Sequence, residues 1–264
     1  MSKTIARLCV FTARAVTAWQ RPFRQSNTLL RISNLLHRTH TVETVAGRIA
    51  FRCTHPQELD YPAQLFTREP ETIDWLNGLD GGSLLWDVGA NVGAYALYAA
   101  RRGAKVWAFE PAPASFSALA ENIRQNELFD RIVALPIALG SSGGLQVLEM
   151  AATNPGSVMH NLRTSGGTGG HAVLSFSADE FRRAYHLPMP THMKVDVDGI
   201  EAEILSGARE IISSPSFRSL IIEIPRHATT TLERIIQMAG TAGLRFTNAA
   251  SYDGHYVENA QFHR

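Results

Sequence analysis

The sequence is poor in several features that would define a protein class at once. Its 264 residues include only two cysteines, Cys9 and Cys53, and these form no metal-ligand or redox motif. This usage suits a reducing compartment and excludes a disulfide-stapled fold. The longest uncharged run, 132–148, is interrupted by glycines and serines, so no segment is predicted to span a membrane. With 45% hydrophobic and 19% charged residues, the chain is long enough to bury a substantial core.

Acidic residues are absent from positions 1–40. Seven of the 25 basic residues lie there, whereas the rest of the chain holds all 24 acids. Pro22 divides the segment into two predicted helices, one ending near Gln20 and one over about 27–36, each with arginines opposite an apolar side. This pattern is typical of a helix pair on an anionic membrane surface or polyanion, and also of helices packed on the protein. Arg14 interrupts the apolar run, which argues against a cleaved secretory signal, whereas an organellar transit peptide would share this composition.

From position 83 onward, short apolar strands alternate with amphipathic helices. The predicted strands are 84–88, 105–109, 132–138, 192–197 and 219–224, and the predicted helices are about 92–102, 114–125, 200–212 and 229–241. Such alternation predicts a doubly wound α/β fold, in which helices cover both faces of a mostly parallel sheet. The chain ends differently, because 244–248 and 256–262 flank the turn signal Ser-Tyr-Asp-Gly-His and predict an antiparallel hairpin.

These patterns predict three parts of the chain. A basic helical extension covers 1–40, and a hairpin and helix over 41–82 lead into a cofactor-binding domain over 83–264. The hairpin is expected over 41–53 with its turn at Ala46-Gly47, and the helix has Pro70 in its first turn. The Gly/Ser-rich stretch 139–177 contains two short strand candidates, LQVLEM and AVLSF.

Four predicted strands end in carboxylates. They are Asp87, Glu110, Asp196 with nearby Asp198, and Glu223. A single one would be explained as a helix cap or turn residue. Ligands of doubly wound sheets bind beyond the carboxyl ends of the strands, so four carboxylates there predict a binding site.

The loop after the first of these strands reads Asp87-Val-Gly-Ala-Asn91-Val-Gly. Its glycines allow sharp bends and a close approach to a ligand. A dinucleotide fingerprint would require glycine in place of Asn91, and a pyrophosphate would be repelled by Asp87. The carboxylate suits a ligand with an ammonium and a sulfonium group better. Glu110, at the next strand end, would accept hydrogen bonds from ribose hydroxyls of either kind of cofactor. Asp87 and the C-terminal hairpin favour S-adenosylmethionine over NAD.

Three blocks, DVGANVG, FEPAPASFSALAENIRQN and MKVDVDGIEAEILSGA, resemble in order and spacing the signature blocks of FkbM-type methyltransferases. The resemblance covers about residues 67–224. It implies a class I, Rossmann-like fold, whose seven-stranded sheet has one antiparallel strand. It also implies methyl transfer from S-adenosylmethionine to a hydroxyl of a sugar, a glycan or glycolipid, or a polyketide-type metabolite.

The resemblance assigns roles to individual residues. The methionine side of the cofactor would be held by Asp87, Gly89, Ala90, Asn91 and Gly93. Glu110, followed by Pro111, would hold the ribose, Ala138 and Leu139 would flank the adenine, and Asp196 would lie near the reacting methyl.

Methyl transfer requires mainly that acceptor oxygen, methyl carbon and sulfur be aligned. Because an alcohol loses its proton as it attacks, a positioned base assists. Asp196, Glu223 and His227 are the candidates, since they follow the strands that border the switch point. His227 as a surface or capping histidine is the alternative. Lys194 is a weaker candidate, because alternation is expected to point it away from the site.

Asp196, Asp198 and Glu201 are residue types that bind Mg²⁺, but they lack a calcium-loop spacing and are explained equally by helix capping, so we predict no metal. Two other functions stay open: an NAD(P)-dependent oxidoreductase with a degenerate dinucleotide loop, and a non-catalytic nucleotide-binding scaffold. We expect a cytoplasmic protein without a nucleic-acid partner. If residues 1–40 bind lipid, it would be peripheral to the inner face of a membrane.

Overall fold

The computed structural model describes residues 2–36, 38–150, 160–164, 170–250 and 257–264. The chain divides into two compact units, Met1–Thr39 and His40–Arg264. Residues 41–82 therefore belong to the same unit as 83–264. In the described part of the chain, no helix is both long and apolar enough to cross a membrane.

The first unit is a helical hairpin of α1 (Ser2–Thr17) and α2 (Pro22–Leu36). The predicted start of the second helix near residue 27 is wrong, because Pro22 occupies the first turn, where its missing N–H is not needed. Polar groups join the two helices. Gln25 Nε2 donates to the carbonyl oxygen of Arg14 at 3.2 Å, and Thr28 Oγ1 donates to Gln20 Oε1 at 2.9 Å.

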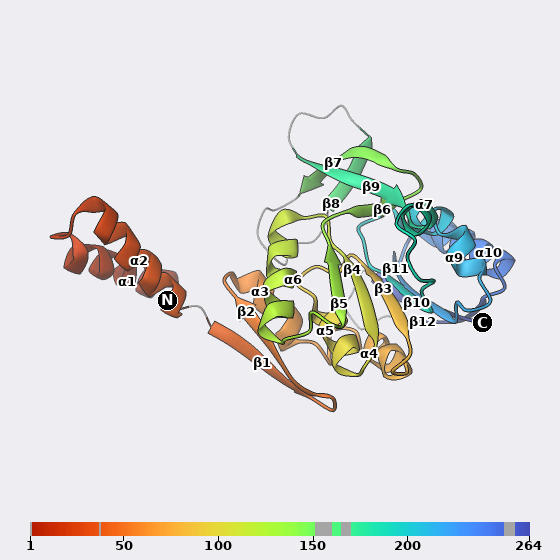
Figure 1. The fold of residues 1–264 in the computed structure, drawn as a ribbon, viewed down its shortest axis with the longest axis horizontal. Helices are drawn as coiled ribbons and strands as arrows, with labels where there is room; N and C mark the ends of the chain where they lie inside the picture. Colours follow the sequence, from red (N-terminus) through yellow and green to blue (C-terminus); the bar gives the residue numbers. More distant parts are fainter. Residues whose placement is uncertain (1, 37, 151–159, 165–169, 251–256) are drawn as a thin grey trace. The chain divides into compact units, whose positions relative to one another are not determined.

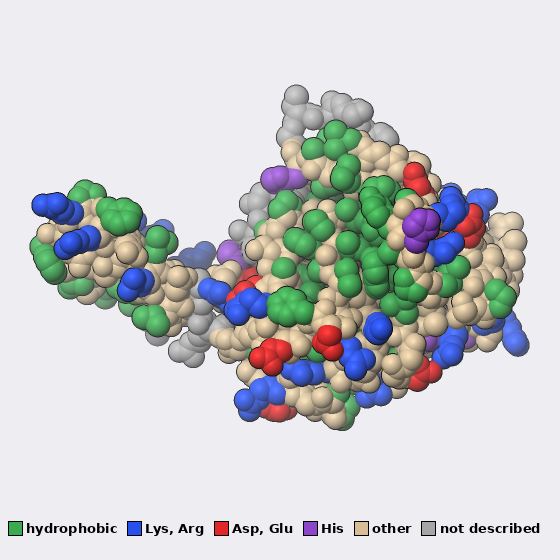
Figure 2. Space-filling model, in the orientation of Figure 1, with side chains coloured by type: hydrophobic (Ala, Val, Ile, Leu, Met, Phe, Trp, Pro, Cys, Tyr) green, Lys and Arg blue, Asp and Glu red, His purple; other side chains and the backbone are tan. Residues whose placement is uncertain are grey.

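The large apolar side chains of this hairpin face outward. Trp19 and Phe23, at the turn between the helices, are 83% and 81% exposed, and Leu8 is exposed as well. No described side chain of α2 is buried. Figure 2 shows basic and hydrophobic side chains interspersed over the visible face of this unit. The hairpin therefore has polar contacts between its helices and exposes most of its large apolar side chains, whereas Leu29 and Ile32 are half-buried.

The second unit is built on a seven-stranded sheet (Figure 1). In spatial order its strands are β12 (Arg245–Ala250), β13 (Val257–His263), β11 (Ser219–Pro225), β10 (His192–Val195), β3 (Leu84–Val88), β4 (Lys105–Phe109) and β5 (Ile132–Leu135). β13 runs antiparallel to both of its neighbours, and the other pairs are parallel. The predicted seven-stranded sheet with one antiparallel strand and a C-terminal hairpin is confirmed. The turn expected at 251–255 lies outside the described residues.

Helices cover both faces of this sheet. One face is packed by α4 (Pro70–Asn77), α5 (Ala94–Arg101) and α6 (Pro113–Gln125), and the other by α7 (Ala178–Ala184), α8 (Glu201–Ser206), α9 (Arg209–Ser213) and α10 (Thr229–Thr241). Alternation along the strands decides the face, since Leu85 belongs to the first core and Trp86 to the second. Gly103, with φ +104°, ends α5 as predicted.

A hairpin and a short helix precede α4. β1 (Arg38–Thr44) and β2 (Gly47–Cys53) confirm the predicted hairpin, and Gly47 takes a positive φ at the turn. The sequence patterns did not predict α3 (Pro56–Ala63). Asparagines fasten β2 to α6, because Asn122 Oδ1 and Asn126 Oδ1 accept hydrogen bonds from backbone N–H groups of β2 at 2.9 Å.

Two predicted elements are wrong in extent. The strand expected over 132–138 stops at Leu135, before Pro136, and β6 (Ala138–Gly140) joins a separate four-stranded sheet. The helix expected over 200–212 is broken between α8 and α9 at Gly207. A Cβ on Gly207 would lie 2.2 Å from the carbonyl oxygen of Gly140, so only glycine fits at position 207, where the two segments cross.

The separate sheet has the order β6, β9 (His171–Ser177), β7 (Gly144–Met150) and β8 (His160–Thr164). β7 and β9 confirm the two predicted short strands. Ala138, Leu148 and Val173 of this sheet pack against Ala112, which follows β4. The small sheet thus borders the carboxyl end of the main sheet (Figure 1).

Candidate active site

The loop between β3 and α5 has a backbone that few residues can adopt. Gly89, Asn91 and Gly93 all have positive φ, at +85°, +50° and +90°. A Cβ on Gly89 would lie 1.9 Å from the carbonyl oxygen of Asp196, and one on Gly93 would lie 2.5 Å from Leu119 Cδ1. These glycines therefore allow the loop to touch the end of β10 and to pack on α6.

Three consecutive N–H groups of this loop are already used within the protein. Those of Gly89 and Ala90 both donate to the carbonyl oxygen of Phe109 at 3.0 Å. That of Asn91 donates to Glu110 Oε2 at 2.8 Å. The loop is therefore fastened to the end of β4, and these donors do not face outward as they would in a phosphate-binding loop.

Glu110 is held by backbone groups on both oxygens. Besides Asn91, the N–H of Ala112 donates to Oε1 at 2.7 Å, across the half-buried Pro111. Burial raises the pKa of Glu110 to about 7, although the two N–H donors oppose the change. Each oxygen keeps a lone pair, so the carboxylate can still accept a hydrogen bond from a ligand.

Asp87, at the end of β3, is 1% exposed, and neither of its carboxylate oxygens has a hydrogen-bond partner among the described residues. Burial raises its pKa to about 6, and Lys194 opposes this change. Burying a carboxylate without hydrogen-bond partners costs free energy unless a ligand supplies such partners. Its position beside a fastened loop fits a cationic ligand group.

Lys194 lies inside this site, so the expectation that it points away is wrong. Residues two apart on a strand share a face, and Lys194 is paired in register with Asp87. The side chain is 2% exposed, with Nζ 2.6 Å from Asp196 Oδ2 and 4.8 Å from the ring centroid of Tyr95. Burial alone would lower its pKa, but the carboxylates of Asp196, Glu69 and Asp87 outweigh burial and raise it.

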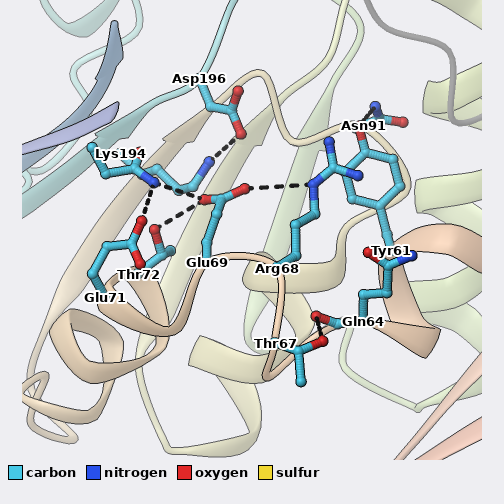
Figure 3. A network of polar contacts seen from close by, with 11 residues as sticks. Tyr61, Gln64, Thr67, Arg68, Glu69, Glu71, Thr72, Asn91, Lys194 and Asp196 are labelled. Atoms are coloured by element: carbon cyan, nitrogen blue, oxygen red, sulfur yellow. Dashed lines mark hydrogen bonds and ion pairs between the residues drawn. The ribbon is translucent and has the colours of Figure 1, made fainter. Parts of the chain in front are cut away.

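Three carboxylates meet beside Lys194. Oxygen atoms of Glu69, Asp196 and Glu223 lie within 4.8 Å of one another. Figure 3 shows the carboxylates of Glu69 and Asp196 turned toward the Lys194 side chain. Glu69 precedes α4 and is 6% exposed; its Oε2 accepts from Thr72 Oγ1 at 3.0 Å and from Asn259 Nδ2 at 3.3 Å. The sequence patterns did not identify Glu69, because nothing near it indicates contact with β10.

Burial and mutual repulsion change the protonation of this group. Burial raises the pKa of Glu223 to about 9, with further increases from Asp196 and Glu69. Burial also raises the pKa of Glu69, and Lys194 opposes this. Carboxylates this close cannot all ionise without a compensating cation.

The segment that contains Glu69 also contacts the loop after β3. Arg68 Nε lies 3.8 Å from Glu69 Oε1, and the guanidinium carbon lies 4.6 Å from the ring centroid of Tyr61. The Tyr61 hydroxyl accepts a hydrogen bond from Asn91 Nδ2 at 3.1 Å (Figure 3). Residues 61–69 therefore link the loop to the carboxylate group.

Other residues singled out from the sequence are not among the three carboxylates that meet. His227 is exposed on the connection between β11 and α10, and Asp198 is exposed after β10. Glu201 is buried and accepts a hydrogen bond from the N–H of Gly199 at 2.8 Å. Ala138 and Leu139 are both buried in β6.

A metal ion is not required to explain the carboxylates that do meet. The ammonium of Lys194 already lies against Asp196 and supplies positive charge to the group. That no metal is bound stays a prediction.

The sequence model of one family, described as the methyltransferase FkbM domain, matches residues 87–240. The chain belongs to the FkbM methyltransferase family. The resemblance carried by the three sequence blocks is thus confirmed. Tyr61, Arg68 and Glu69 lie before the range that the family model matches.

Relatives from two other organisms are similar to this FkbM-family chain. The hexuronic acid methyltransferase AglP of Haloferax volcanii is 32% identical, covering 61% of this chain and 63% of AglP. The methyltransferase sdnD of Sordaria araneosa is 28% identical, covering 50% of this chain and 62% of sdnD. The chain therefore spans a little under two thirds of the length of these relatives.

A crystal structure of an FkbM methyltransferase from Methylobacillus flagellatus has the same fold. It aligns with a TM-score of 0.53 at 17% identity, over 70% of this chain and 44% of that one.

Proposed function

We propose that the protein transfers the methyl group of S-adenosylmethionine to a hydroxyl oxygen of a sugar, a glycan or glycolipid, or a polyketide-type metabolite. The observation that carries this proposal is Asp87, a buried carboxylate without partners in the loop region that the FkbM family model matches. An ammonium group beside it would recover the free energy that burial costs.

The surrounding residues fit the rest of this cofactor. The loop from Gly89 to Gly93 would contact its methionine part, and the remaining lone pairs of Glu110 would accept hydrogen bonds from ribose hydroxyls. Ala138 and Leu139 would offer an apolar surface to the adenine. The N–H groups of the loop are occupied, which argues against a pyrophosphate and hence against the oxidoreductase alternative.

When bound, the cofactor supplies an electrophilic methyl group, whose bond to sulfur breaks with the electron pair left on sulfur. The protein must then align the acceptor oxygen and remove its proton. Lys194 fixes the position of Asp196, which we assign to orienting the acceptor hydroxyl. Of the other two candidates for the proton acceptor, we favour Glu223, which lies in the carboxylate group, over His227, which is exposed on the connection after β11.

A carbohydrate is the first acceptor class to test. AglP is named for a hexuronic acid, and the family resemblance extends over the cofactor loop and β10 of this chain. Extracts incubated with methyl-labelled S-adenosylmethionine and the protein, followed by mass spectrometry, would identify the labelled class. Labelled protein or nucleic acid in place of a sugar or metabolite would contradict the acceptor assignment.

Calorimetry tests the cofactor directly. S-adenosylmethionine and S-adenosylhomocysteine are expected to bind the full chain, and NAD⁺ is not. If NAD⁺ bound and the other two ligands did not, the proposal would be wrong and an oxidoreductase would be favoured. Asp196→Ala separates an enzyme from a nucleotide-binding scaffold, because an enzyme would keep cofactor binding and lose methyl transfer. A scaffold would show no transfer in either form.

We also propose that the hairpin of α1 and α2 rests on an anionic membrane surface. It carries basic residues without any acid, and most of its large apolar side chains are exposed. Trp19 and Phe23 lie beside Arg21 and Arg24, a combination that suits the interface between headgroups and acyl chains.

Co-sedimentation with phosphatidylcholine vesicles, with and without phosphatidylglycerol, tests this contact. The full chain is expected to sediment only with the anionic vesicles, and the double variant Trp19→Ala/Phe23→Ala is expected to stay in solution. Phe129→Ala removes another exposed aromatic side chain, 66% exposed, from the other unit and serves as the matched control. Equal sedimentation of all three proteins would show that the hairpin is not the contact.

A further inference from the structure

Glu69, Asp196 and Glu223 come from three separate parts of the chain: the residue before α4, the end of β10 and β11. Only two of these residues lie in the range that the family model matches. We propose that Glu69 and Glu223 form a carboxylate pair that shares one proton, and that this pair receives the proton of the acceptor hydroxyl. This inference rests on the proposed methyl transfer.

The charges around Glu223 explain why the pair would hold a proton. Asp196 and Lys194 face it from β10, and Glu69 and Arg68 face it from the segment before α4. Its register partner on β13, Asn259, is neutral. Asp87 of β3, in register with Lys194, adds a fourth carboxylate, and the side chain of Tyr95 on α5 hydrogen-bonds Glu69. Four carboxylates thus meet two cations, and each of these side chains is buried or half-buried. Sharing a proton between two of the carboxylates lowers the excess negative charge.

Asp196 is the member of the group that a cation holds in place. Its Oδ2 lies 2.6 Å from Lys194 Nζ, a charge-assisted hydrogen bond that already occupies this oxygen. Glu69 has no cation so close, since Arg68 Nε lies 3.8 Å from its Oε1. Proton exchange therefore falls to Glu69 and Glu223.

Ligand charge controls the proton of this pair. A cationic ligand group beside the two carboxylates favours their ionised form, so the pair releases its proton as such a ligand enters. During transfer, the acceptor O–H bond breaks and its proton goes to one carboxylate of the pair. At the same time the new O–C bond forms, and the electrons of the C–S bond stay on sulfur. The pair regains its proton as the sulfur loses its positive charge.

Comparing two ligands that differ at sulfur isolates this effect. S-adenosylmethionine carries a sulfonium and S-adenosylhomocysteine a neutral thioether, while their ammonium, ribose and adenine groups are the same. Titration calorimetry of the full chain at neutral pH, in buffers of different ionisation enthalpy, counts the protons released by each ligand. S-adenosylmethionine is expected to release about one proton more than S-adenosylhomocysteine, because the coupled pair titrates as a unit.

Variants locate the proton. The difference in proton release between the two ligands is expected to disappear in Glu223→Gln and in Glu69→Gln. It is expected to remain in His227→Ala, because His227 is exposed. If the difference in proton release disappeared in His227→Ala, the assignment of the proton to Glu69 and Glu223 would be overturned. The wild-type difference is also expected to vanish above pH about 9, where Glu223 has already lost its proton.

The wild-type protein decides the question even if a variant fails to fold. Equal proton release with both ligands would overturn the pair and leave the cofactor assignment standing. If neither ligand binds, both the proposed function and this inference fail.

Discussion

The two halves of the sheet's carboxyl edge both hold carboxylates, but by different means. Beyond β4, Glu110 accepts hydrogen bonds from the N–H groups of Asn91 and Ala112, so the backbone sets its position. Asp196, directly after β10, and Glu223, near the end of β11, lie close to each other and to Glu69, so side chains surround them. The backbone therefore fixes the position of the carboxylate beyond β4, whereas the carboxylates at β10 and β11 are placed so that they can exchange a proton.

This difference has a physical reason. Backbone N–H groups keep their protons and set the position of the Glu110 carboxylate, although burial still raises its pKa to about 7. Carboxylates that face one another change protonation whenever a charge enters or leaves. Asp87 lies between the two halves, at the end of β3, and its carboxylate has no hydrogen-bond partner among the described residues. Four substitutions or conditions test this division, beginning with the largest expected effect.

Gly89→Ala is expected to abolish binding of S-adenosylmethionine and to lower the melting temperature. The added Cβ would lie 1.9 Å from the carbonyl oxygen of Asp196 and would force the fixed loop away from β10. Gly47→Ala is the matched control, because Gly47 also has a positive φ but has no atom within 4 Å of an added Cβ. Calorimetry and thermal unfolding measure both. Equal effects of the two variants would show that backbone strain, and not the contact with Asp196, requires Gly89.

Asp87→Asn is expected to weaken the binding of S-adenosylmethionine by about 10- to 100-fold, the value of one hydrogen bond to a charged group. The same variant is expected to raise the melting temperature of the ligand-free protein, because a buried carboxylate without partners is removed. Titration calorimetry and scanning calorimetry measure the two effects. A destabilised variant with unchanged affinity would contradict the role of Asp87 as a ligand contact.

The stability of the ligand-free protein is expected to fall as pH rises toward 9. Burial raises the pKa of Asp87 to about 6, of Glu110 to about 7 and of Glu223 to about 9, all above their values in the unfolded chain. The folded protein therefore binds more protons across this range. This contribution to stability is complete below pH about 4 and is lost as pH passes each folded pKa.

Urea unfolding of the wild type and Glu223→Gln at pH 7 and pH 9 measures the share of Glu223. The variant is expected to lose less stability between these two pH values. The same loss in both proteins would mean that Glu223 keeps an ordinary carboxyl pKa.

His227→Ala is expected to change the rate of methyl transfer by no more than about twofold, the usual range for an exposed side chain. Glu223→Gln, made four residues earlier, is expected to slow transfer far more. Steady-state assays with an identified acceptor compare the two. A large loss of the transfer rate in His227→Ala would indicate that His227 is the proton acceptor.

Local patterns sufficed for much of the sheet. The strands at 84–88 and 105–109 and the helix at 229–241 were predicted with their observed bounds, because their apolar spacing and flanking residues point to the same structure. The errors arose where a distant contact decides the outcome. Gly207 breaks a helical pattern because Gly140 crosses it, and periodicity contains no information about that crossing.

The candidate site was predictable to the same degree. Asp87, Glu110 and Asp196 were found because each follows an apolar strand. Glu69 was missed, since it stands beside Lys194 only through the docking of α4 near β10, and locally it is only the residue before a proline. Lys194 was misplaced by an alternation rule that should have put it on the same face as Asp196.

The small four-stranded sheet has one further consequence, which concerns variation among related proteins. Its first and last strands, β6 and β9, pair in parallel, with Ala138 opposite Ser175 and Gly140 opposite Ser177. The chain thus leaves and rejoins the main fold at neighbouring points, and the crossing at Gly207 closes that junction. β8, the outermost of the four strands, pairs only with β7 among the described residues. Its length and sequence can therefore vary among related proteins while β5 and β10 keep their places.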